Sequence, residues 1–315
     1  MNILIFGSGA VGLGLASCLL KVGVDTSLVA GRSTINALKT NGLYRTGIFG
    51  HFQAEPEAFS AFTDLKQIQS KIYDFVLVCT KSDQTQTAAE NIFAHRNLLK
   101  PECKIVHFQN GWGNAEKFLH FFSQEVIYSG RVITGFTRTA PNHVDITVHA
   151  DAVHIGSLFN QPLKAVEPLC QAIDNGGIPC RVWKDIDKDL WAKMLYNCAL
   201  NPLGAILGVP YGALADNLHT REIMDRIIEE IYTVMDKYGF TTYWPTANEY
   251  KNIFYSKLVP PTAKHRSSTL QDLQSGKKTE IKDLTGQILE LANKANVDVP
   301  MNTMIYHLIR FREEN

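Results

Sequence analysis

Three polar side chains recur at intervals of four in the otherwise apolar segment WAKMLYNCALNPL, residues 191–203. On a helix, residues four apart are offset by about 40°, so Lys193, Asn197 and Asn201 form one slowly turning stripe. An ammonium donates hydrogen bonds and an amide both donates and accepts them, so all three groups need polar partners. Burying such groups without partners costs on the order of 1–3 kcal/mol each, so they either face solvent or line a polar cleft. The apolar neighbours favour the cleft, and Pro202 is expected to disturb the helix near its end.

A second segment suited to chemistry is the glycine turn GSGAVG, which follows the apolar run of residues 1–6 and precedes a helical pattern. Strand, turn and helix in this order are the setting in which GxGxxG binds a dinucleotide. Gly7 permits the tight turn, Gly9 lets the pyrophosphate approach the backbone, and Gly12 lets the helix pack close to the strand. Unpaired N–H groups at the helix start attract the phosphates. The cofactor-binding residues predicted in this turn are Gly7, Ser8, Gly9, Ala10, Val11 and Gly12.

The end of the second expected strand predicts which dinucleotide binds. An NAD site usually carries Asp or Glu here to accept hydrogen bonds from the ribose 2′-OH. This chain instead reads AGRS at residues 30–33, with Arg32 and no carboxylate. A guanidinium grips a phosphate through two parallel hydrogen bonds, so the sequence predicts NADP(H), bound through Arg32. A solvated loop arginine is the alternative.

Two further strands of the same sheet are expected to end in polar residues. YDFVLVCTKS ends in Lys81, and CKIVHFQNGWGN ends in Asn110. Ligands of open α/β sheets bind beyond the carboxyl ends of the strands, so both residues are expected to face the cofactor. Taken alone, Lys81 is also compatible with a surface residue and Asn110 with a simple turn. The alternating segment DITVHADAVHIGS then predicts antiparallel strands at the sheet edge.

From about residue 185 onward, helical patterns dominate. Amphipathic helices are expected over residues 219–239, 283–297 and 301–315. The polar segment of residues 257–280 is expected to be a loop, either mobile or reaching over a ligand cleft. The sequence therefore predicts an NADP-binding Rossmann-type domain over residues 1–183 and a helical substrate and catalytic domain over residues 184–315.

Size and composition agree with two ordinary globular domains. A chain of 315 residues exceeds a typical single core, and 31 basic residues cancel 31 acidic ones, which gives no reason to propose nucleic acid or membrane as a partner. The six scattered cysteines show no metal-ligand or redox spacing, so we expect reduced thiols, a cytoplasmic protein and no metal. The amphipathic helices leave monomer and homodimer open.

Taken together, these motifs resemble the ketopantoate reductases (2-dehydropantoate 2-reductases) over nearly the whole chain. The matching segments are GSGAVG, Arg32, CTKSDQT, FQNGWGN, WAKMLYNCALNPLGA and SSTLQDLQSGKKTEI. The resemblance implies an α/β fold: a doubly wound Rossmann-type domain followed by an all-helical one, as in 6-phosphogluconate dehydrogenases, with the active site between them. It also implies NADPH-dependent reduction of 2-dehydropantoate, a small-molecule 2-keto acid, to pantoate in pantothenate and coenzyme A biosynthesis.

The resemblance further implies roles for individual residues. Lys193 matches the family's proton-donating lysine, and Glu280 matches an acidic residue that lies where cofactor and substrate meet, as a hydrogen-bond acceptor or to orient Lys193. The implied substrate-binding residues are Asn110, Lys193, Asn197, Asn201 and Ser268. The implied cofactor contacts outside the glycine turn are Arg32, Lys81, Asn110 and Glu280.

One position departs from the family pattern. Ketopantoate reductases carry a further asparagine in a CPNG-like turn, whereas this chain reads VPYG with Tyr211. A phenol still donates one hydrogen bond, but it is bulkier and reshapes the pocket. The substrate therefore stays open between ketopantoate, another branched 2-keto acid and a keto acid with an amine. A non-catalytic NADP-binding sensor is an alternative of another class, and it would not need a proton donor such as Lys193.

Overall fold

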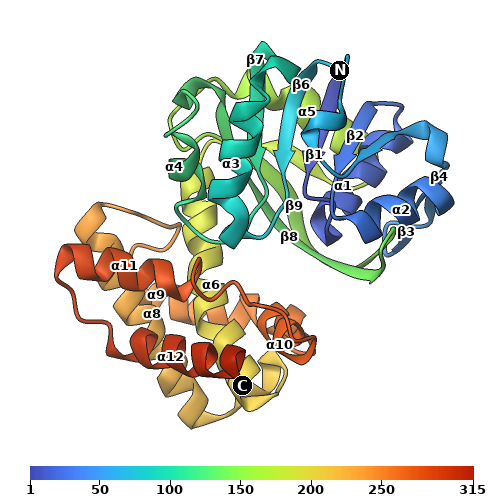
Figure 1. The fold of residues 1–315 in the computed structure, drawn as a ribbon. Helices are drawn as coiled ribbons and strands as arrows, with labels where there is room; N and C mark the ends of the chain where they lie inside the picture. Colours follow the sequence, from blue (N-terminus) through green and yellow to red (C-terminus); the bar gives the residue numbers. More distant parts are fainter. The chain divides into compact units, whose positions relative to one another are not determined.

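The computed structural model describes all 315 residues, and the chain divides into two compact units (Figure 1). The first unit consists of residues 1–109 and 114–186, and the second of residues 110–113 and 187–315. The division expected from the sequence, at residue 183, left the segment Asn110–Gly113 with the nucleotide-binding half. In the structure this short segment packs with the helices of the second unit.

The first unit is built on one mixed sheet of ten strands in the order β4-β3-β9-β8-β7-β6-β1-β2-β5, with β10 beside β9. Strands β8, β7, β6, β1, β2 and β5 are neighbours in this order, and each pair of neighbours is parallel. Strands β8 and β9 are antiparallel. The antiparallel pair predicted from the sequence is confirmed, but its place at the sheet edge is wrong, because β3 and β4 extend the sheet beyond β9. The strands are β1 Asn2–Phe6, β2 Asp25–Val29, β3 Leu43–Gly47, β4 Phe52–Ala54, β5 Ser60–Phe62, β6 Tyr73–Val78, β7 Leu99–His107, β8 Ile127–Ala140, β9 His143–Gly156 and β10 Cys180–Val182.

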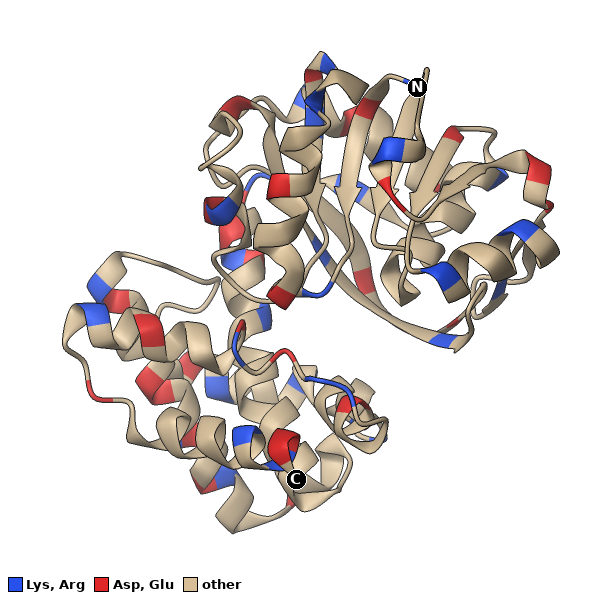
Figure 2. Cartoon of the chain, in the orientation of Figure 1, with Lys and Arg blue, Asp and Glu red and all other residues tan.

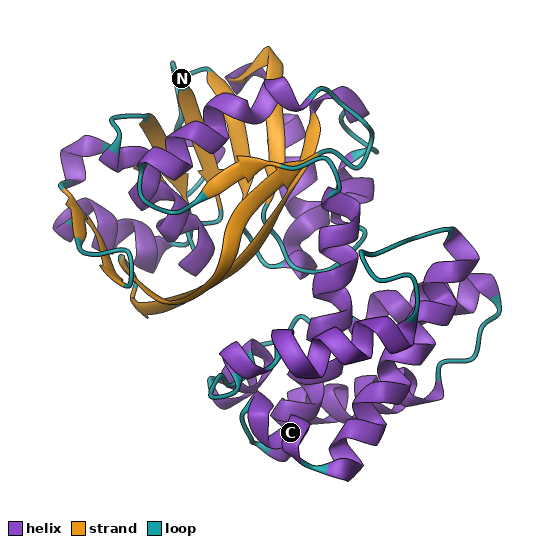
Figure 3. Ribbon diagram, turned by 180° about the vertical axis from the view of Figure 1, so that it is seen from behind, coloured by secondary structure: helices purple, strands orange, loops and turns teal.

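Both faces of this sheet are covered by helices, as Figure 3 shows. In β1, Ile3 and Ile5 point into one hydrophobic core and Leu4 points into the other, which explains why the strand reads as a continuous apolar run. The first core also contains side chains of α1 (Ala10–Lys21), α2 (Arg32–Asn41) and α5 (Glu167–Asn175), and the second contains side chains of α3 (Thr85–Ala94) and α4 (Asn114–Phe118). The predicted doubly wound architecture is therefore confirmed.

The second unit is helical, and the three amphipathic helices predicted from the sequence are present. Its helices are α6 Ile186–Leu207, α7 Tyr211–Asp216, α8 Leu218–Tyr238, α9 Ala247–Ile253, α10 Ser268–Gln274, α11 Thr285–Ala295 and α12 Pro300–Glu314. Helix α8 ends at Gly239, whose φ of 69° is the left-handed conformation that terminates many helices. Helices α6, α10 and α12 share a small apolar core that includes Ala205, Leu270 and Ile309.

Two local expectations are wrong. Helix α6 continues through Pro202 to Leu207, because the residues around the proline are buried and their packing outweighs one lost backbone hydrogen bond. The segment of residues 257–280 is not a simple loop, since it contains α10. That helix is capped by the buried Ser267, whose hydroxyl accepts the Leu270 N–H at 3.1 Å.

Basic and acidic residues alternate along the ribbon of each unit, and both kinds occur in both units (Figure 2). This mixture is what equal numbers of basic and acidic residues, 31 of each, lead one to expect. None of the helices combines the length and the apolar character that crossing a bilayer requires.

Candidate active site

A chain of hydrogen bonds joins an amine, an amide and a carboxylate within the second unit. Lys193 donates from Nζ to Asn110 Oδ1 at 2.7 Å, and Asn110 donates from Nδ2 to Glu280 Oε2 at 2.8 Å. Lys193 lies in α6, Asn110 follows β7, and Glu280 lies between α10 and α11. All three side chains are half-buried, so they remain open to solvent. The structure thus brings together three of the residues predicted from the sequence.

The direction of the two hydrogen bonds follows from the charged groups at the two ends of the chain. An ammonium only donates hydrogen bonds and a carboxylate only accepts them. The amide of Asn110 satisfies both by turning its oxygen to Lys193 and its nitrogen to Glu280. The two charged groups therefore fix the orientation of the amide, and the amide in turn fixes one N–H of the ammonium.

The backbone next to Asn110 explains why glycine follows it. Gly111 has a φ of 91°, and a Cβ at this position would lie 2.3 Å from the carbonyl oxygen of Asp283. Gly113 has a φ of 85°, and its Cβ would lie 3.0 Å from Oε1 of Gln287. Only glycine allows both the positive φ and the close approach at residue 111. The segment therefore lies directly against the chain that carries Glu280.

At the far end of the stripe, Asn201 is paired with the residue that departs from the family pattern. Asn201 is buried, and the Tyr211 hydroxyl donates to its Oδ1 at 2.5 Å. Burial raises the pKa of Tyr211, with a smaller contribution from Tyr196, so the phenol stays protonated and able to donate at neutral pH. The Tyr211 ring also contacts the rings of Tyr196 and His265 edge-on. This tyrosine thus holds the amide oxygen of Asn201 and leaves its N–H groups available.

The two remaining residues predicted to bind substrate are not linked to this chain. Asn197 is half-buried one turn along α6 from Lys193, and its amide makes no hydrogen bond within the protein. Ser268 is the first residue of α10 and is exposed, whereas its neighbour Ser267 is buried as the cap of that helix. Both hydroxyl and amide are therefore unengaged by the protein.

In the first unit, the glycine turn has the geometry that a pyrophosphate needs. Gly7 has a φ of 101°, and a Cβ there would lie 2.5 Å from the Thr80 nitrogen. A Cβ at Gly12 would lie 2.2 Å from the Gly7 oxygen, so helix and turn are in close contact, whereas nothing lies within 4 Å of a Cβ at Gly9. Gly9 is also the N-cap residue of α1, and the first turn of α1 has no acidic side chain. The open space beside Gly9, at a helix N-terminus, fits a bound phosphate group.

The other residues of the turn are placed by the same strand and helix. Ser8 is buried and its hydroxyl donates to the Val29 carbonyl oxygen at 3.3 Å, which ties the turn to β2. Ala10 and Val11 form the half-buried start of α1. Arg32 is exposed at the start of α2, directly after β2.

Lys81 follows β6 and is held by its backbone. Its carbonyl oxygen accepts from Gln109 Nε2 at 3.2 Å, and the same amide nitrogen donates to the Thr85 hydroxyl at 2.9 Å. The ring nitrogen Nδ1 of His107 lies 3.3 Å from Oε1 of Gln109. Burial lowers the pKa of His107 to about 4, so this imidazole is neutral at physiological pH. The ends of β6 and β7 are thus joined by neutral hydrogen bonds, which supports the loop that carries Lys81.

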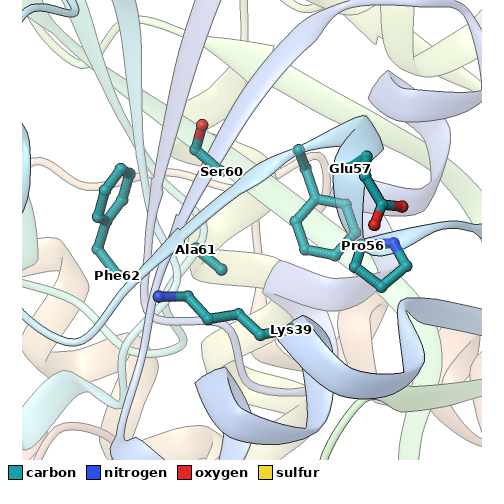
Figure 4. A pocket seen from close by; sticks show the side chains of 7 residues that line it. Lys39, Pro56, Glu57, Ser60, Ala61 and Phe62 are labelled. Carbon is teal, nitrogen blue, oxygen red and sulfur yellow. The ribbon is translucent and has the colours of Figure 1, made fainter.

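The first unit also has an open pocket of about 460 Å³ between α2 and β5 (Figure 4). Lys39 extends along it, and Glu57 and Phe62 belong to its wall. None of the residues predicted to bind cofactor or substrate lines this pocket. The pocket is therefore not part of the candidate active site.

Sequence reasoning missed Trp112, which holds the segment next to Asn110. It packs against Trp191 and Phe240 with ring centroids 4.8 and 5.1 Å away. The signal that would have drawn attention to it is the GWG motif, because a tryptophan between two glycines is poorly explained as an ordinary solvent-exposed turn.

Comparisons with known proteins assign both halves of the chain to one family. Residues 3–160 match the family described as ketopantoate reductase PanE/ApbA, and residues 185–313 match the family described as ketopantoate reductase PanE/ApbA C terminal. A 2-dehydropantoate 2-reductase of Aquifex aeolicus is 36% identical over 99% of this chain and 97% of that protein. One from Pyrococcus abyssi is 27% identical over 99% of this chain and 98% of that protein.

Solved structures show the same fold. A PanE/ApbA family ketopantoate reductase from Ralstonia eutropha superposes with a TM-score of 0.86 at 27% identity, covering 100% of this chain and 99% of the other. The ternary structure of D-mandelate dehydrogenase with NADH and anilino(oxo)acetate gives a TM-score of 0.88 at 21% identity, with the same coverage of 100% and 99%. At 21% identity, the similarity to D-mandelate dehydrogenase shows a shared fold and nothing about function.

Proposed function

The chain belongs to the ketopantoate reductase family, and on that basis we propose that it reduces 2-dehydropantoate to pantoate with a nicotinamide dinucleotide as hydride donor. This reaction supplies pantoate for pantothenate and coenzyme A. The observation that carries the proposal is the hydrogen-bonded chain from Lys193 through Asn110 to Glu280. These hydrogen bonds fix the orientation of the Lys193 ammonium, as a proton donor requires.

In the proposed reaction, Lys193 is the proton donor. When bound, the dihydronicotinamide supplies the hydride that adds to the ketone carbon. The Lys193 ammonium donates a hydrogen bond to the ketone oxygen, stabilises the negative charge that develops there, and transfers its proton to complete the hydroxyl group. The neutral amine that remains takes up a proton from solvent before the next turnover. Asn110 and Glu280 keep the amine aimed during these steps.

The amides of α6 are proposed to hold the substrate. Because the Tyr211 hydroxyl occupies Oδ1 of Asn201, this amide offers N–H groups to a substrate oxygen. Asn197, one turn nearer to Lys193, has both its amide oxygen and its N–H groups available. We propose Ser268 as a further contact, in keeping with its position in the segment SSTLQD.

For the cofactor, we propose NADP(H) rather than NAD(H). The backbone around Gly9 is proposed to hold the pyrophosphate, as its open space and helix N-terminus suit an anion. Arg32, exposed at the start of α2 with no acidic residue in the first turn, is proposed to bind the 2′-phosphate. Lys81, Asn110 and Glu280 are proposed as further cofactor contacts.

The proposed function is tested by the rate of NADPH oxidation with a panel of 2-keto acids. We expect ketopantoate to give the highest kcat/KM, well above pyruvate and 2-ketoisovalerate. If another branched keto acid is preferred, the reaction class holds and the substrate assignment fails. If calorimetry detects NADPH binding while no keto acid is reduced, the sensor alternative replaces the enzyme.

A further inference from the structure

The segment Asn110–Gly113 is fixed to the helical unit by a cluster of aromatic rings. The ring centroids of Trp112 lie 4.8 Å from those of Trp191 and 5.1 Å from those of Phe240, and Trp191 and Phe240 are themselves 4.8 Å apart. Trp112 is only 8% exposed and Trp191 is fully buried. Ring contacts of this kind add directional attraction to the burial of a large apolar surface.

Two residues of this cluster lie close in sequence to the hydrogen-bonded residues Lys193, Asn110 and Glu280, which we call the amine site. Trp191 precedes Lys193 by two residues in α6, and Trp112 follows Asn110 by two residues. Gly111, between Asn110 and Trp112, has no side chain that could fix the segment by packing. Its φ is positive, and glycine adopts many other backbone conformations as readily, so the glycine alone does not hold this one. The indole of Trp112 is therefore the side-chain anchor that sets where the Asn110 backbone lies relative to Lys193.

We propose that Trp112 is a positioning residue of the reductase, which acts through Asn110 by holding its amide between Lys193 and Glu280. This inference rests on the proposed function. It assigns a role in turnover to a side chain that carries no group able to exchange a proton with the substrate. Proton donors gain much of their effect from alignment, and a misplacement of about 1 Å can lower a rate by about a hundredfold.

A double-mutant cycle tests the proposal, with Trp112→Ala, Asn110→Ala and both together. We expect Trp112→Ala to lower kcat by about 10–100-fold with the best keto acid. The Kd of NADPH should change no more than it does in Asn110→Ala, because Asn110 is also a proposed cofactor contact. Because Trp112 acts through Asn110, the double variant should be no slower than Asn110→Ala alone. If the fold-losses of kcat in the two single variants multiply in the double variant, Trp112 acts independently of Asn110 and the proposal is overturned.

The matched control is Trp244→Ala. Trp244 is half-buried in the same unit, and its ring contacts are with Tyr243 and Tyr250, at 5.9 and 5.2 Å between centroids, and not with the Trp112 cluster. It should lower the melting temperature while leaving kcat within about twofold of wild type. Trp112→Phe keeps a ring in the cluster, so it should recover most of the kcat lost in Trp112→Ala. Equal losses of kcat in the two alanine variants would reduce Trp112 to a merely structural residue.

A second readout does not depend on turnover, so it separates this proposal from the proposed function. The rate at which trinitrobenzenesulfonate labels Lys193, followed by mass spectrometry, reports how readily its amine reaches the reagent. The hydrogen bond to Asn110 Oδ1 holds this amine in place, so loss of that bond should leave the amine more accessible. Labelling should therefore accelerate about threefold or more in both Trp112→Ala and Asn110→Ala, and not in Trp244→Ala. Unchanged labelling in Trp112→Ala would refute the positioning role even if no keto acid were reduced.

Discussion

The glycine turn of the first unit and the amine site of the second achieve their geometry in opposite ways. The turn depends on missing side chains: a Cβ at Gly12 would collide with the Gly7 oxygen at 2.2 Å, and the space beside Gly9 is open. The amine site depends on side chains that are present, with Lys193 and Glu280 joined through Asn110. Substitutions should therefore affect the turn by adding atoms and the amine site by removing them.

The two regions also differ in how far apart their residues lie in the sequence. The turn is one continuous stretch, GSGAVG, between a strand and a helix. In the amine site, Asn110 lies 83 residues from Lys193 and 170 residues from Glu280. A local motif specifies its own geometry, whereas a site of distant residues depends on the packing of the whole unit.

The largest effect is expected from removing the amine. Lys193→Ala should lower kcat by about 10²–10⁴-fold, the range expected for the loss of a general acid. The Kd of NADPH should stay nearly unchanged, since the proposed cofactor contacts in the glycine turn are untouched. Stopped-flow reduction and fluorescence titration measure the two quantities separately. A fall in kcat of less than tenfold would show that another group donates the proton.

Adding a methyl group to the turn should separate folding from cofactor binding. Gly12→Ala forces a Cβ against backbone, so unfolding by urea should show a loss of about 1–3 kcal/mol, as for other overpacked sites. Gly9→Ala is the matched control, because nothing lies within 4 Å of its Cβ. It should leave the stability almost unchanged and weaken NADPH binding, since the methyl group enters the space proposed for the pyrophosphate. Equal stabilities of the two variants would contradict the different roles of the two glycines.

These contrasts explain what the sequence predicted and what it did not. The strand burial on both faces, the glycine turn and the cap of α8 at Gly239 follow from local patterns, and the structure agrees with them. The path of α6 through Pro202 and the aromatic anchor at Trp112 were not predicted, because both depend on contacts with residues distant in sequence. The link from Lys193 to Glu280 was anticipated only through family resemblance.

A smaller and more selective effect is expected at Arg32. Arg32→Ala should weaken NADPH by about 10–100-fold, the worth of a charge-assisted hydrogen-bonded pair with a phosphate. The Kd of NADH should change by less than about twofold, because NADH lacks the 2′-phosphate. Titrating both cofactors with the wild type and the variant gives the comparison. Similar losses for NADH and NADPH would place the 2′-phosphate elsewhere.

The smallest effect is expected where one hydroxyl orients one amide. Tyr211→Phe removes the hydrogen bond to Asn201 Oδ1 but keeps the buried ring, so the pocket should retain its shape. Because Asn201 can then turn its amide, KM for ketopantoate should rise by about 3–10-fold, as expected for one hydrogen bond. The matched control is Tyr196→Phe, since the Tyr196 hydroxyl is paired with Thr262 instead of Asn201. A lower KM in Tyr211→Phe would mean that the hydroxyl competes with the substrate for Asn201 and does not prepare it. Such a result would weaken the contrast with the glycine turn, since removing atoms beside Asn201 would then improve the site.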